Sequence, residues 1–539
     1  MGRIALTQIG TSLYTVDLSS GTVSSALTLP TGVTLSSSRK PRFATLNQWT
    51  AVVNSPTQNI VIDPEGTVRP LTLRPPINGP TTAVSSTGLT GAYKYKVSHV
   101  ILNNEGELLS ESPLSPASVS LTLANEGVAL TDIPISLDTI TARRVYRTLA
   151  GGSLYFHVFD VDGNSNTAFF DNKADATLEL LPAGATTLAM PPGALAGIRF
   201  KIIVEWKSRL WAVADDPALI DTIYASETNK VYTWPNSAVA YPTGQDKEGI
   251  VALVPRRNQL GILKRNGLWQ IGGSAGSTGI SFNNISISQI VVGKAGCVAP
   301  DSVVVVNDKA YWLGKDGVYE WSDEGVVNIT NDTVAPWFKT DTYFQRSRFP
   351  NAFAKYNEAR HSYELHLANT GDSTENRWVS FYLKNRKWYG PHLTGLFTPS
   401  HAAHVMDDNG LPMALVGAST GVIYTANSTT IRDGASTAID YDVYTPFYSA
   451  EAPDIMHYWG ELSMHSDIES GGTLTVTPYL GGLDAGAGTA ISHDLTLGRQ
   501  RLRRLGNGRL MRLRLRENSA NQGVSVYGFE CQVHELGRR

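Results

Sequence analysis

The sequence predicts an all-β protein: a β-propeller of six or seven blades, an inserted fibronectin III-like β-sandwich and a C-terminal β region. Three observations predict it. No stretch of three or more turns repeats apolar residues at helical spacing. Short alternating runs bounded by Gly, Asn, Asp or Pro recur instead, as at residues 93–97, 302–306 and 473–477. An aromatic-bearing strand motif also repeats along the chain.

This repeat predicts the propeller. Each instance is an aromatic-aliphatic strand, and in several of them a glycine-containing turn and another strand follow. The later instances lie roughly 40 to 60 residues apart, close to the length of a four-stranded blade. One blade cannot bury both its faces, so several must pack radially; a long non-repeating β-sandwich is the alternative. The instances are residues 12–17, 60–63, 209–213, 267–271, 317–321 and 421–424.

The repeat is interrupted, which divides the chain into four parts. Residues 1–77 are the first part of the propeller, and residues 187–440 supply its remaining blades. Residues 78–186 show short strands at a spacing of about 8 to 12 residues, which is typical of a seven-stranded sandwich. A loop insertion of this kind costs little entropy per added residue. Residues 441–539 form either a terminal sandwich or the strands that close the ring.

Composition excludes several classes of protein. Lys and Arg number 45 against 48 Asp and Glu, and the net charge of −3 excludes a generally basic protein that coats nucleic acid. Cys297 and Cys531 are isolated in the sequence, so neither a disulfide scaffold nor a cysteine zinc site is expected. No apolar run of about 18 residues occurs, and we expect neither export nor membrane insertion.

The motifs that resemble catalytic sequences are predicted to be turns. GxSxG occurs around Ser274 and Ser419, but Ser419 precedes a predicted strand where a nucleophile elbow needs a helix. Residues 314–321 resemble the Asp-box of sialidase-type propellers without its leading Ser or Thr. Residues 293–296 lack the spacing of a P-loop.

The acidic and histidine clusters are also predicted to be neither metal sites nor catalytic sites. His401 and His404, followed by Asp407 and Asp408, form the most metal-like cluster, but on a strand the two histidines point to opposite faces. The carboxylates at residues 215–216 and at residues 105 and 107 are interpreted as acidic turns. We therefore expect no catalytic residue, no cofactor and no metal.

One segment near the C-terminus is strongly basic. On a strand, residues 512, 514 and 516 would lie on one face and the apolar residues between them would face a core. Such a row can bind phosphates or carboxylates. A solvated face, an intersubunit face against carboxylates of a neighbouring protein, and a channel face in contact with DNA all stay open. The arginines are Arg499, Arg501, Arg503, Arg504, Arg509, Arg512, Arg514 and Arg516.

In the order of its motifs, the chain resembles the tail-nozzle proteins of short-tailed bacteriophages (tail tubular protein B) and the related packaged-DNA stabilisation, or tail-hub, proteins. The likeness covers most of residues 90–330 and is weaker at both ends. Individually the motifs are generic. They are residues 93–97, 104–107, 110–113, 144–147, 170–171, 207–213, 223–227, 232–235, 262–272, 303–306 and 311–319.

The resemblance implies a structural virion protein and no enzyme. It implies a ring, expected to be a homohexamer, below the head–tail adaptor proteins, with a channel for genome retention and ejection. Tail fibres, spikes or a needle would attach to it, and double-stranded DNA would pass without sequence-specific binding. The resemblance also implies that the protein is assembled in the host cytoplasm and is located in the virion tail. The alternatives are a propeller glycan hydrolase or depolymerase of the tail, and a non-catalytic glycan- or protein-binding propeller.

Overall fold

The computed structural model confirms the all-β prediction. Its only α-helix among the described residues is α1 (Ala335–Lys339), and the short 3-10 turns are η1 (Asp175–Thr177), η3 (Pro300–Ser302) and η4 (Arg346–Asn351). The chain divides into two compact units, Met1–Leu393 with Pro399–Tyr424, and Thr394–Thr398 with Thr425–Arg539. The structure describes residues 4–18, 20–102, 105–106, 108–178, 199–231, 234, 239–240, 248–272, 286–292, 295–330, 334–394, 397–407, 409–426, 432–433, 437–438, 441–469, 471–518 and 524–537.

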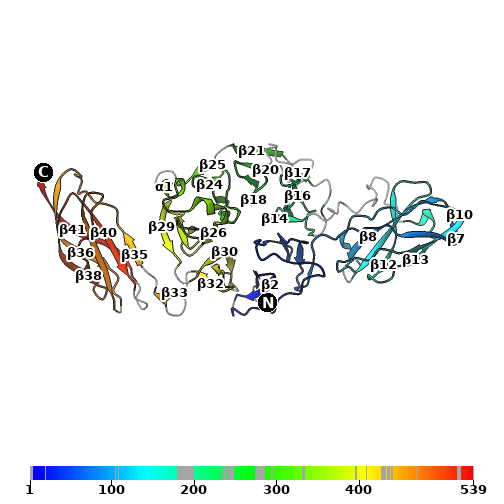
Figure 1. Ribbon diagram of the computed structural model, residues 1–539, viewed down its shortest axis with the longest axis horizontal. Helices are drawn as coiled ribbons and strands as arrows, with labels where there is room; N and C mark the ends of the chain where they lie inside the picture. The colour runs from blue at the N-terminus through cyan, green and yellow to red at the C-terminus, as the bar shows by residue number, and fades with distance from the viewer. Residues whose placement is uncertain are drawn as a thin grey trace. The chain divides into compact units, whose positions relative to one another are not determined.

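Six antiparallel sheets of the first unit follow one another around a centre (Figure 1). In each, the strands pair in chain order, and five of the six have four strands. The sheets are β3 (Arg42–Leu46), β4 (Trp49–Val53), β5 (Ile60–Ile62) and β6 (Val68–Pro70); β14 (Phe200–Trp206), β15 (Arg209–Ala214), β16 (Ile223–Ala225) and β17 (Val239–Ala240); β18 (Ala252–Pro255), β19 (Leu260–Lys264), β20 (Gly267–Gly272) and β21 (Ser286–Val292); β22 (Val304–Val306), β23 (Lys309–Leu313), β24 (Val318–Ser322) and β25 (Gly325–Asn328); β26 (Phe353–Asn357), β27 (Ser362–Leu367), β28 (Arg377–Tyr382) and β29 (Lys387–Leu393); and β30 (Pro399–Met406), β31 (Pro412–Ala418) and β32 (Ile423–Ala426).

Apolar clusters join the first five of these sheets to one another. The aromatic residues of the repeat lie in them: Trp211, Trp269 and Trp321 are almost fully buried between neighbouring sheets. The repeat therefore places one large side chain per sheet where two sheets meet, which is why each sheet needs a neighbour. We interpret this part as a β-propeller. A two-stranded hairpin, β1 (Ile4–Ile9) and β2 (Ser12–Asp17), packs on the outer half of the first sheet.

The predicted insert contains two sheets that share one core. Three strands form one sheet in the order β13-β10-β7, and four form the other in the order β12-β11-β8-β9. Tyr93, Tyr95, Val128 and Val145 from both sheets are buried against one another. The strands are β7 (Thr81–Tyr93), β8 (Tyr95–Leu102), β9 (Leu108–Glu111), β10 (Leu121–Thr131), β11 (Ala142–Thr148), β12 (Tyr155–Asp162) and β13 (Phe169–Asp171).

The second unit is a two-sheet sandwich with a core of its own. Its sheets have the orders β35-β40-β37-β38 and β39-β36-β41, and Trp459, Leu474 and Leu513 lie buried between them. Apart from Thr394–Thr398, the unit consists of residues 425–539, and the expected C-terminal region, residues 441–539, lies within it. Its strands are β33 (Arg432–Asp433), β34 (Thr437–Ala438), β35 (Tyr441–Tyr444), β36 (Met456–Ser466), β37 (Thr473–Gly481), β38 (Ile491–Asp494), β39 (Arg499–Gly508), β40 (Leu510–Glu517) and β41 (Val526–Gly537).

Candidate functional site

A cavity of about 670 Å³ lies where the last sheet of the first unit, β30–β32, meets the N-terminal elements. We call it the seam cavity. Its walls are strand β1, residues 37–41, one face of β3 and β4, strands β30 and β31, and residues 417–423. Among the described residues, no buried apolar cluster joins β30–β32 to the sheets on either side. In the described part of the chain, buried apolar clusters thus join the first five sheets but not the last one.

The walls of the seam cavity are apolar and cationic. Ile9, Phe43, Val422 and Ile423 line it, and each leaves 37% to 47% of its surface exposed. The charged side chains of the lining are Arg39 and Lys40, and the described lining contains no carboxylate. A volume of this size is within the range of small-molecule and peptide sites.

A buried carboxylate outside the cavity lining pairs with one of the lining cations, Lys40, and with the nearby Arg42. The side chain of Asp301, in η3, is 5% exposed, and its Oδ2 lies 3.1 Å from Nζ of Lys40. Arg42 contacts Oδ1. Burial alone would raise the pKa of Asp301, but Arg42 and Lys40 outweigh it and hold that pKa below its ordinary value. This carboxylate therefore stays charged and serves to connect residues 40–42 with η3.

The pKa of His401 is affected by the same charged groups, Lys40, Arg42 and Asp301. Its side chain is open to the cavity and lies 6.0 Å from the ring of Phe353. Surrounding protein lowers the pKa of His401, Lys40 and Arg42 act in the same direction, and Asp301 opposes them. The imidazole is consequently neutral at pH 7.

The face of β26–β29 that carries Lys355 and Glu364 has a polar centre. Nζ of Lys355 lies 2.5 Å from Oε2 of Glu364, and both side chains are at most 3% exposed. Asn357 and Ser362 donate to the other oxygen of Glu364 at 2.7 and 3.3 Å. The charge of the Glu364 carboxylate is balanced by the Lys355 ammonium, and both carboxylate oxygens have polar partners. A glycosidase acid would need access to a substrate, and Glu364 has none.

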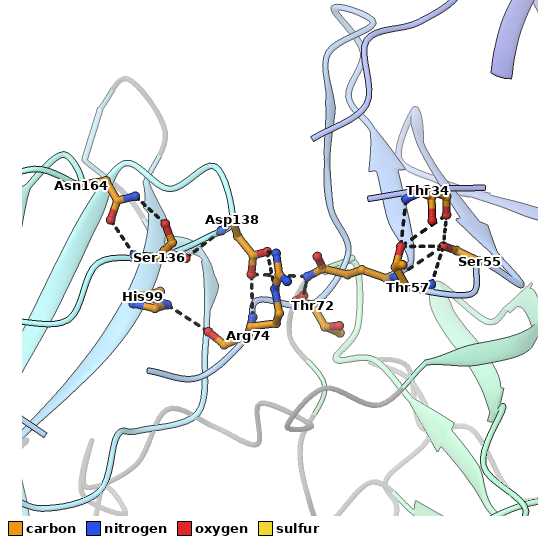
Figure 2. A network of polar contacts seen from close by, with 10 residues as sticks. Thr34, Ser55, Thr57, Thr72, Arg74, His99, Ser136, Asp138 and Asn164 are labelled. Carbon is orange, nitrogen blue, oxygen red and sulfur yellow. Dashed lines mark hydrogen bonds and ion pairs between the residues drawn. The ribbon is translucent and has the colours of Figure 1, made fainter. Parts of the chain in front are cut away.

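A second polar network fastens the insert to the first sheet of the ring, as Figure 2 shows. Asp138, in the loop after β10, has a side chain that is 0% exposed. It accepts from Nε and from the backbone N–H of Arg74, both at 2.8 Å, and from Gln58 at 3.4 Å. Nδ1 of His99 lies 3.0 Å from the carbonyl of Arg74. Because both partners of Asp138 belong to the ring, the carboxylate is the centre of this joint.

The eight arginines of the basic segment do not form one continuous surface. In β40, Met511, Leu513 and Leu515 are buried, so Arg512 and Arg514 lie on the outer face of the sheet, as their alternation indicates. Arg514 binds Asp442 through two hydrogen bonds at 2.8 and 2.5 Å. The Arg512 guanidinium lies 4.4 Å from the ring centre of Tyr444.

Four of the other arginines lie on the opposite sheet of the sandwich, one lies in the turn that joins the two sheets, and one lies at the end of β40. Strand β39 carries exposed Arg499, Arg501, Arg503 and Arg504, and the same sheet carries Glu461 on β36 and Glu530 on β41. Arg499 is 2.9 Å from Glu530, and Arg501 is 3.4 Å from Glu461. Arg509 is exposed in the turn between β39 and β40, and Arg516 is exposed at the end of the β40 row. The continuous basic run in the sequence thus becomes two separate faces.

The remaining motifs fall on turns and strands. Ser419 lies in the hairpin turn between β31 and β32, with Gly421 at φ +89°, and no helix follows it. His401 contacts Phe353, while His404 lies 3.5 Å from Glu358, so the two histidines have different partners. Asp407 accepts the backbone N–H groups of its own turn. Ser274, Glu107, Asp408 and residues 293–294 lie outside the described residues.

Two further findings concern metals and membranes. In the described part of the chain, no group of three or more His, Cys, Asp or Glu side chains is placed to hold a metal ion. Among those same residues, no helix has the length and apolar character that a membrane crossing requires.

Sequence reasoning missed the seam cavity and the Asp138 joint. Residues 36–42 read Ser-Ser-Ser-Arg-Lys-Pro-Arg, and this short cationic stretch was the available signal. Nothing in the sequence shows that its partners are Asp215 and Asp301, which come from later sheets.

Comparison with known proteins does not assign the chain to a family. No family profile matches the chain, and no curated protein matches it. Several solved structures match at low similarity. They include BBS1N in complex with ARL6DN (9% identity, 71% of this chain and 90% of that one, TM-score 0.27), an exo-β-1,3-galactanase from Phanerochaete chrysosporium (9%, 81% and 100%, 0.19) and PorZ of Porphyromonas gingivalis (9%, 97% and 79%, 0.27). At these TM-scores the likenesses carry no argument about function.

Proposed function

We propose that this chain is a non-catalytic structural subunit, a component of the tail nozzle or tail hub of a short-tailed bacteriophage. The observation that carries the proposal is the joint around the buried Asp138 carboxylate, which connects the insert to Arg74 and Gln58. A scaffold must hold its modules in place, and a buried carboxylate that accepts several hydrogen bonds from the neighbouring module favours this. The resemblance found in the sequence supplies the virion context, with a hexameric ring, adaptor proteins and fibres or spikes as partners.

The state of the buried carboxylates supports a scaffold over a hydrolase. Asp301 and Glu364 each contact a cation closely, and Asp138 is enclosed. Glycoside hydrolysis needs two carboxyl groups facing one sugar, about 5 to 9.5 Å apart. A propeller glycan hydrolase or depolymerase remains the second candidate, because the seam cavity offers hydroxyl groups and an aromatic ring to a ligand.

An assay with host surface polysaccharide separates the two candidates. The scaffold proposal predicts no new reducing ends after incubation with the purified chain, and self-association at high protein concentration in analytical ultracentrifugation. Product formation above a heat-inactivated control would support the hydrolase and contradict the scaffold.

The two arginine faces allow a matched test of the channel hypothesis. Changing Arg512, Arg514 and Arg516 to Ser alters one sheet of the second unit, and changing Arg499, Arg501 and Arg503 to Ser alters the other. If the β40 face lines a DNA channel, only the first triple variant changes genome release while particles still assemble. If both variants assemble and eject normally, neither face contacts DNA.

A further inference from the structure

The N-terminal hairpin has an open edge, and we propose that this edge binds an extended peptide segment of a partner protein as an additional β-strand. The proposed site is strand β1 together with the seam cavity. It does not depend on the virion context proposed above.

The register of the hairpin shows which backbone groups are available. Strands β1 and β2 pair from Ile4 opposite Asp17 to Ile9 opposite Ser12, around a two-residue turn with Gly10 at φ +61°. Such a turn makes Ile9 and Ser12 a hydrogen-bonded pair. By alternation, the backbone N–H and C=O groups of Leu6 and Gln8 point away from β2.

The two edges of this hairpin differ in whether their outward backbone groups have hydrogen-bond partners. On β2, Thr15 donates its N–H to Oγ of Ser24 at 3.0 Å and accepts from the N–H of Ser24 at 2.9 Å. The carbonyl of Leu13 accepts from Leu27 at 2.9 Å. Residues 22–27 thus cover the outer edge of β2. Within the described residues, the outward backbone groups of Leu6 and Gln8 have no such partner, which is the condition for strand addition.

The open edge of β1 faces the seam cavity. Every residue from Ala5 to Gly10 lines that cavity. Successive side chains of a strand point to opposite faces, so an unbroken run of lining residues means that the edge itself borders the space. A partner strand lying along this edge would therefore occupy the cavity.

The walls determine the chemistry of the partner strand. Ile9, Phe43, Val422 and Ile423 are exposed apolar surface inside the cavity, which favours apolar side chains at alternate positions. The cations beside them favour an acidic end. Because each cation already contacts a carboxylate, we expect the acidic end to set orientation more than affinity.

One contact shows where the acidic end of an antiparallel partner strand would lie. Nε2 of Gln8 donates to the carbonyl of Ser36 at 2.7 Å, so the stretch leading to Arg39 and Lys40 starts beside the C-terminal end of β1. An antiparallel partner begins at that end. Its acidic residues should therefore be N-terminal.

The test uses a fluorescein-labelled peptide, Asp-Glu-Val-Thr-Val-Thr-Val, acetylated and amidated, with the full chain and fluorescence anisotropy. We expect saturable binding with a dissociation constant on the order of 10 to 100 μM. Gln8→Pro removes the edge N–H, whereas Gln8→Ala removes only the side-chain amide. Gln8→Pro should weaken binding by about tenfold or more, and Gln8→Ala by less than about threefold.

Modified peptides keep the test decisive if Gln8→Pro lowers the melting temperature. Two peptides, N-methylated at odd or at even positions, probe the unaltered chain. The proposal predicts that one methylation pattern abolishes binding and the other retains it, because only one edge of the peptide pairs with β1. Equal binding of both peptides, equal binding by the two Gln8 variants, or no saturation up to about 1 mM would overturn the proposal.

Discussion

Asp138 and Asp301 are buried carboxylates whose cationic partners come from distant parts of the sequence. Arg74 is 64 residues from Asp138, and Arg42 begins β3 in the first sheet, far in the sequence from η3, which carries Asp301. A sequence shows that such residues are charged but not which of them become buried, because burial depends on contacts made only in the folded chain. For this reason neither ion pair could be predicted, although both hold the first unit together.

We predict that Asp138→Ala loosens the insert. The change removes the acceptor shared by Arg74 and Gln58 and should cost about 2 to 4 kcal/mol of stability. Hydrogen exchange should become faster around residues 71–80 and 136–142, while β18–β25 keep their protection. Asp162→Ala, at an exposed position, is the matched control. Unchanged exchange in both variants would show that the joint does not fix the insert.

We predict a pH dependence that originates at Asp301. Its pKa is lowered in the folded chain, so its stabilisation is present above the ordinary carboxyl pKa of about 4 and is lost as pH falls through the lower folded value. Asp301→Asn should lower the urea midpoint at pH 7 and should have a smaller effect below about pH 3. A difference from the wild-type chain that stays constant from pH 7 to pH 2 would contradict this origin. Asp484→Asn, at an exposed site, serves as the control.

For a strand with one buried face, the sequence predicts which side chains point into the core. The alternation of arginines with Met511, Leu513 and Leu515 correctly placed the apolar side chains of β40 in a core. What the pattern could not show is that β39 and β40 belong to different sheets, so that the two halves of the arginine run face apart. Periodicity reports which side of a strand is buried, but strand pairing is decided by contacts along the whole unit.

We predict that the core face of β40 contributes far more stability than its arginine face. Leu513→Ala should destabilise the second unit by about 2 to 4 kcal/mol, because it opens a cavity between the two sheets. Arg512→Ala, one position away on the outer face, should cost less than about 1 kcal/mol. Chemical denaturation of both variants checks this, and equal costs would mean that the assigned register of β40 is wrong.

At the scale of the whole molecule, the repeat predicted the architecture better than any single motif. Its instances at residues 209–213, 267–271 and 317–321 coincide with β15, β20 and β24, the second strand of one sheet and the third strand of each of the next two. The last sheet departs from the pattern: it has three described strands, it lacks an apolar cluster with its neighbours, and it borders the seam cavity. The repeat is weakest at its two ends, and the sequence therefore left the blade number open.

Electron microscopy of the purified full chain at high protein concentration tests the scaffold proposal most directly, since symmetry and pore are visible without knowledge of any partner. The proposal predicts closed rings, six-fold if the resemblance holds, with a continuous central channel. A homogeneous population of single molecules under these conditions, with no ring at any concentration, would contradict it.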